Sequence, residues 1–175
     1  MAQHKISDDS TIYHYTLLRR FTRKHLFYWL YSACLLLWLF ADLVYLGWEG
    51  AFVLVCSAAA ISVVHTVIVL LLRHLSQGKV PHIWGWMFAY PFYGYLPLGY
   101  VPVSQWNRIN RHRLLIGFAL LALFYVWMPI AWLANSAAAH YFLLLPQLIY
   151  VGSSMRRNRS GLLKATPRDI SLYKN

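Results

Sequence analysis

Acidic residues are scarce in this chain, in which five Asp and Glu stand against sixteen Lys and Arg among 175 residues. A magnesium-dependent enzyme that acts on diphosphates needs clustered carboxylates to hold its metal, and no acids cluster here. The motifs Gly-x-Ser-x-Gly, Cys-x-x-Cys and His-Glu-x-x-His do not occur either. The sequence therefore indicates no catalytic residue and no metal site, and it favours a protein that is not an enzyme.

Basic residues are also missing from four long apolar runs. Residues 26–47, 51–72, 114–135 and 137–155 contain no Lys or Arg, and Asp42 carries the one formal charge inside them. At a rise of about 1.5 Å per residue, a helix of such length crosses a hydrocarbon core of roughly 30 Å. The pattern predicts an all-α membrane protein whose four transmembrane helices form two antiparallel hairpins, with Pro129 and Pro146 as kinks in the second hairpin.

The basic residues predict how these helices are threaded. All sixteen Lys and Arg lie before the first run, between the second and third, or after the fourth, and the connections at 48–50 and around Ser136 have none. By the positive-inside rule, both termini face the cytoplasm. We expect a membrane domain, 26–155, between a cytoplasmic basic segment, 1–25, and a cytoplasmic basic tail, 156–175. Within the first segment, Leu17–Lys24 is expected to lie at the inner headgroups as an amphipathic approach.

A formal net charge of +11 raises the question of nucleic-acid binding. The basic residues flank apolar runs, however, and this placement is typical of charges that fix topology and meet anionic lipid headgroups. The expected surroundings are therefore the lipid bilayer of a bacterial inner membrane and its anionic headgroups, with no nucleic acid.

The segment 81–104 is the unusual part of the chain, because it combines eight aromatic residues with four prolines and three glycines. Such a composition argues against one continuous helix. Both ends are expected on the cytoplasmic side, which leaves two shapes: an interfacial lid, which we favour, or a re-entrant hairpin that turns near residues 93–95. Its rings are predicted to form a surface for a partner or for lipid, made of Trp84, Trp86, Tyr90, Tyr93, Tyr95 and Tyr100.

Four polar residues inside the predicted spans are candidates for a functional site, namely Asp42, His65, His140 and Gln147. An ionisable group at membrane depth suggests function by default. Asp42 is near the outer end of its span and is expected to pair with His140 or to bond Asn135. Interhelical hydrogen bonding is the other interpretation, and it is the one we favour for Asp42 and His65.

Haem ligation is the most specific role considered for a histidine inside the membrane, and it requires two histidines at matching depth. Only His65 is placed well inside a span, while His140 is placed near an outer end. No cofactor is therefore expected, unless the segment after Pro81 folds inward and raises His82 to the same depth.

These observations favour a non-catalytic integral membrane accessory subunit that binds another membrane protein or a second copy of itself. A small oligomeric transporter or channel for a small or lipidic solute is the alternative, with a path by Asp42, His65 and Gln147. A membrane redox protein or enzyme is the third hypothesis.

Overall fold

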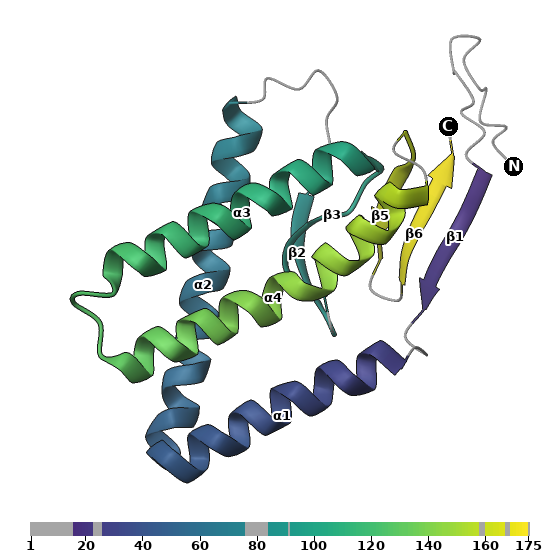
Figure 1. Ribbon diagram of the computed structural model, residues 1–175. Coiled ribbons are helices and arrows are strands. Elements are labelled where there is room, and N and C mark those ends of the chain that lie inside the picture. Colours follow the sequence, from purple (N-terminus) through teal and green to yellow (C-terminus); the bar gives the residue numbers. More distant parts are fainter. Residues whose placement is uncertain are drawn as a thin grey trace, which may run out of the picture.

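The computed structural model describes residues 16–22, 26–75, 84–90, 92–157, 160–166 and 169–174. His82 and much of the predicted segment 1–25 lie outside these residues. Within them the chain forms four helices and six short strands (Figure 1). In chain order these are β1 (Thr16–Thr22), α1 (Leu26–Leu46), α2 (Trp48–Leu75), β2 (Trp84–Ala89), β3 (Phe92–Pro97), β4 (Val101–Pro102), α3 (Val103–Phe124), α4 (Ile130–Arg157), β5 (Leu162–Ala165) and β6 (Asp169–Lys174).

Two of the described helices, α1 and α2, are long and apolar enough to cross a membrane. Windows of 18 residues within Phe27–Leu46 and Trp48–Leu75 have mean hydropathies of 1.7 and 2.5. The helices meet at Gly47, whose φ of 63° is a conformation that glycine adopts without a steric penalty. A Cβ on Gly50 would lie only 2.8 Å from the Asp42 carbonyl oxygen, so glycine also permits the close approach of α2 to α1.

The predicted boundaries of the second helical hairpin are wrong. The turn between α3 and α4 lies at 125–129, whereas Ser136 lies inside α4. Pro129 therefore precedes a helix instead of kinking one, while Pro146 does stand inside α4. The reason for the error is that the turn is itself apolar: Tyr125 and Trp127 are 63% and 72% exposed. Because the apolar run continues through the turn, composition cannot locate the end of the helix.

The prediction of an all-α fold is corrected by two antiparallel sheets. One sheet has four strands in the order β1-β6-β5-β4, and the other is the hairpin of β2 and β3. In the first sheet, β1 pairs with β6 from Thr16 opposite Lys174 to Thr22 opposite Asp169. The described parts of the two basic terminal segments are therefore paired with each other, and the sequence analysis did not predict this pairing.

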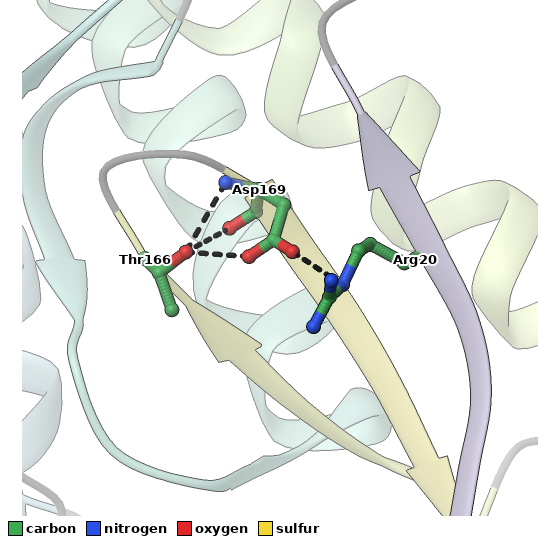
Figure 2. Close-up of polar contacts among 3 residues, drawn as sticks. All are labelled: Arg20, Thr166 and Asp169. Atoms are coloured by element: carbon green, nitrogen blue, oxygen red, sulfur yellow. Dashed lines mark hydrogen bonds and ion pairs between the residues drawn. The ribbon is translucent and has the colours of Figure 1, made fainter.

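A polar cluster at one end of the four-stranded sheet joins three strands (Figure 2). Thr166, in the turn between β5 and β6, accepts a hydrogen bond from the Asp169 backbone N–H at 3.1 Å, and its hydroxyl also lies against the Asp169 carboxylate. The Asp169 carboxylate in turn pairs with Nε of Arg20 on β1 at 2.7 Å. The cluster fixes the register between the first and last described strands.

The aromatic hairpin of β2 and β3 folds back among the helices. Its strands pair from Trp84 opposite Pro97 to Ala89 opposite Phe92, so the turn begins at Tyr90 and does not lie near 93–95. At this turn the ring of Tyr90 lies 5.7 Å from that of Tyr31, and its hydroxyl is hydrogen-bonded to Ser32. Since Tyr31 and Ser32 belong to α1, the hairpin reaches across to the first helix.

Together the hairpin, the four-stranded sheet and the adjoining ends of α3 and α4 enclose the largest apolar core. Leu96 of β3, Trp106 of α3 and Leu163 of β5 are each 0% exposed within it. α2 contacts each of the other three helices and crosses α3 and α4 obliquely (Figure 1). The sheet therefore closes one end of the helical bundle, and the turns at Gly47 and 125–129 lie away from it.

Candidate functional site

Buried polar side chains collect between the helices and form what we call the polar seam. Its members come from all four helices and are at most 8% exposed: Asp42, Ser57, His65, Asn110, Arg113, Asn135, Ser136, His140 and Gln147. All four of the polar residues predicted inside the spans belong to this set. Buried polar groups need hydrogen-bond partners, and the partners divide the seam into three parts.

The first part lies near the turn between α1 and α2. Asn135 Nδ2 is 3.4 Å from Asp42 Oδ1, and Asn135 Oδ1 accepts a hydrogen bond from the Trp38 indole at 3.0 Å. Of the two partners expected for Asp42, the structure thus shows Asn135 and not His140. Next to Asn135 on α4, the hydroxyl of Ser136 lies 3.2 Å from the hydroxyl of Ser57 on α2.

The middle part is a pair of histidines. His65 Nε2 and His140 Nδ1 are 2.8 Å apart, and His140 Nε2 is 3.3 Å from the Leu114 carbonyl oxygen. A carbonyl only accepts, so His140 carries its proton on Nε2 when it is neutral, and its Nδ1 must accept from His65. The contacts therefore assign a tautomer to each ring.

The depth predicted for His140 is corrected by this pairing. The sequence placed His140 near the outer end of a span because that span was expected to begin at 137. The helix begins at Ile130, seven residues earlier, so about two more turns precede His140, and its ring reaches His65. His65 thus has a histidine at its own depth, as a pair of haem ligands would require. The two rings, however, hydrogen-bond directly to each other.

Glycine at position 117 makes the histidine pair possible. A Cβ there would lie 2.1 Å from Cε1 of His140, which is far inside van der Waals contact. The His140 ring also packs edge to face with the ring of Phe118, at 4.8 Å between the ring centroids. The imidazole is therefore confined between α3 and its partner on α2.

The third part of the seam is centred on Arg113, which is 1% exposed. Its Nη1 donates to Gln147 Oε1 at 2.9 Å and lies 3.4 Å from Asn110 Oδ1. Both partners are neutral amides. Among the described residues, the one ion pair joins Arg20 to Asp169 and does not involve Arg113. A buried guanidinium held by neutral groups is unusual, because removing its charge from water costs several kcal/mol.

Sequence reasoning did not single out Arg113, which it counted only as a topology-determining charge. A signal was available in the spacing of α3. The buried residues Trp106, Asn110, Arg113 and Gly117 follow one another at intervals of four, three and four, so they share a face of the helix. A basic residue on the same face as a tryptophan and a glycine is expected to point inward.

The predicted aromatic surface is divided by the structure into separate contacts. Trp84 is buried and stacks on Tyr95, while Trp86 is 44% exposed and stacks on Phe88 at 5.8 Å. Tyr90 and Tyr93 pack edge to face near the turn of the hairpin. Tyr100 lies apart from them, because its ring contacts Tyr173 of β6. Trp86 and Phe88 thus remain as the aromatic pair that the hairpin presents outward.

A cavity of about 350 Å³ lies outside the seam, between α2 and α3. It is lined by Leu72, Arg73, Leu75, Gln105, Arg108, Ile109 and His112.

Comparison of the chain with protein-family models, curated proteins and solved structures finds no match. Arguments about function therefore rest on the seam, the hairpin and this cavity.

Proposed function

We propose that the chain is a multi-pass membrane protein with both termini on the cytoplasmic side. Besides the apolar α1 and α2, the charge distribution supports this placement. The described Lys and Arg residues lie on β1, β5 and β6, or in the parts of α2, α3 and α4 nearest those strands. Since β1 and β6 pair, the first and last described strands share one side of the bundle.

A reporter fused after Asn175 tests the placement. A reporter that is active only in the cytoplasm should be active in this fusion and silent when it is inserted at Trp127, in the turn between α3 and α4. Activity of both fusions on one side would refute the arrangement of four spans.

Within the membrane, we propose that the protein acts as a non-catalytic subunit that binds a larger membrane protein. The open hairpin of β2 and β3 carries this proposal. It is a two-stranded sheet, so among the described strands none pairs with the outer edge of β2. An unpaired strand edge cannot remain in contact with lipid, because hydrocarbon offers no hydrogen bonds to backbone N–H and C=O groups. A partner that covers β2 supplies those bonds.

The outward aromatic pair gives the same edge an anchor. Phe88 is 79% exposed and Trp86 lies parallel to it at an interplanar angle of 8°. Aromatic residues dominate the binding energy of many interfaces, where one such anchor carries about 2 kcal/mol or more. Lipid contact alone spreads over many side chains and does not depend on one ring.

A photo-crosslinking residue at position 88 tests the proposal in intact membranes. It should join the chain to one defined partner, and Trp86→Ala should abolish the adduct without reducing membrane insertion. The matched control is the same probe at Tyr45, which is 85% exposed near the end of α1 and about four turns away from the Tyr31 contact with the hairpin. A product of twice the mass of the chain would identify a second copy as the partner, and labelling of lipid alone from both positions would overturn the proposal.

A small proton or solute path is the second candidate, and the polar seam favours it. The Asn135 bond to Asp42, the histidine pair and the Arg113 cluster follow one another along α4. Proteoliposomes that carry a pH-sensitive dye test this alternative. A flux that is lost in His65→Ala would support it, and equal dye responses in wild-type and protein-free vesicles would refute it.

A further inference from the structure

Charge and shape single out the cavity between α2 and α3. Its polar lining is basic or neutral: Arg73 comes from the last turn of α2, and Gln105, Arg108 and His112 come from the first half of α3. None of the lining residues is acidic. A volume of about 350 Å³ is at the small end of the range for ligand sites, which begins near 300 Å³.

The basic groups are held in place by their neighbours. Arg73 Nη1 donates to the Tyr95 hydroxyl at 3.2 Å, and its guanidinium lies 6.0 Å from the centre of the Trp84 ring. His112 Nδ1 donates to the Arg108 carbonyl at 2.7 Å, which fixes the ring relative to the helix. Two residues of the hairpin thus orient a cation on α2 toward the side of α3 that carries Arg108 and His112.

Two further features match a ligand with a charged head and an apolar body. Leu72, Leu75 and Ile109 supply an apolar part of the wall. Gln105 lies in the first turn of α3, where the helix macrodipole is positive and favours an anion. Fork-shaped guanidinium groups suit phosphate oxygens particularly well.

We propose that this cavity binds the phosphate of an anionic phospholipid headgroup, with Arg73, Arg108 and His112 around the phosphate and the leucines beside the glycerol. Basic pockets between membrane helices on the cytoplasmic side are suited to such headgroups. The inference that the phosphate belongs to a lipid rests on the membrane placement proposed above, while the inference that the site binds phosphate rests on the cavity alone.

The chain offers a matched pair of variants for the test. Arg108→Gln removes a lining cation, and Arg111→Gln removes an equal charge from an exposed position of the same helix that does not line the cavity. The full-length protein is purified in a neutral detergent at moderate ionic strength and titrated with phosphatidylglycerol or phosphatidylcholine. Thermal stabilisation and lipid adducts in native mass spectrometry are measured.

Wild type and Arg111→Gln should prefer phosphatidylglycerol over phosphatidylcholine, and Arg108→Gln should weaken binding of phosphatidylglycerol about tenfold. Arg108→Lys should recover part of this loss because it restores the charge without the fork. Should Arg108→Gln fail to fold, His112→Gln, an exposed position, should show the same direction of change.

Titration with inorganic phosphate distinguishes a phospholipid headgroup from free phosphate as the ligand. If millimolar phosphate alone stabilises wild type but not Arg108→Gln, the ligand is free phosphate and the site stands. Equal losses in the Arg108 and Arg111 variants would overturn the site, since they would show that binding follows surface charge. The titration is done in detergent, so its failure is independent of the reporter test of membrane placement.

Discussion

Replacement of Gly117 by alanine is the sharpest test of the histidine pair. A Cβ at this position would lie 2.1, 2.7 and 2.9 Å from Cε1, Nδ1 and Nε2 of His140. All three atoms belong to one ring, so the ring must move as a whole. Its movement breaks the bond to His65 at 2.8 Å and the bond to the Leu114 carbonyl at 3.3 Å.

The expected magnitude follows from opposing effects on the free energy of unfolding. Leaving buried polar groups without partners costs about 1–3 kcal/mol, and crowding a packed site costs a similar amount. Alanine in place of glycine inside a helix returns about 1 kcal/mol. Gly117→Ala should therefore destabilise the protein by about 2 kcal/mol, as measured by circular dichroism during reversible unfolding in mixed micelles.

Two further variants identify the cause. In a His140→Ala background the obstructing ring is gone, so Gly117→Ala should become neutral or stabilising by up to about 1 kcal/mol, a coupling of about 3 kcal/mol between the two sites. Gly152→Ala is the control on α4, because no atom lies within 4 Å of its added Cβ, and it should not destabilise. If Gly117→Ala leaves stability unchanged in both backgrounds, the proposed contact between α3 and α4 is wrong.

Two other predictions concern the ends of the bundle. Asn135→Ala removes the acceptor of the Trp38 indole and the partner of Asp42 Oδ1, so the same unfolding assay should show a loss of about 1–3 kcal/mol; wild-type stability would argue against this contact. Asp169→Asn removes the charge that pairs with Arg20, whose side chain is 58% exposed. Global stability should change by less than about 1 kcal/mol, while hydrogen exchange should accelerate in β1 and not in the helices; uniform acceleration would contradict a local role.

The sequence was sufficient for the helices of the first hairpin because their signal is local. The end of α1 is marked by Gly47, and α2 begins immediately afterwards, so the predicted bounds are close to those observed. The strands left no comparable signal. β1 and β6 are almost the whole chain apart, and a bulge between Leu17 and Arg19 interrupts the alternation that would reveal β1. Pairing between remote segments is decided by the tertiary structure.

The polar residues were found from the sequence, but their partners were not. Asp42, His65, His140 and Gln147 stand out because a polar group in an apolar run is visible without a structure. Which of them meet depends on helix boundaries, and an error of seven residues in the start of α4 displaced His140 by about two turns. Whether these residues serve a function stays a prediction, whereas their burial is a property of the fold.

Arg113 links the two parts of the protein for which we propose functions. Its side chain is covered by β3, where a Cβ on Gly94 would lie 3.9 Å from Nη2 of the arginine. Gly94 has a φ of 111°, a conformation that other residues rarely adopt, so the strand can pass over the guanidinium in this way only with glycine. Gly94 also pairs with Met87, which stands between the outward rings of Trp86 and Phe88. The hairpin and the polar seam thus meet where Gly94 approaches Arg113, and any other residue at position 94 would have to adopt a strained backbone beside the buried guanidinium.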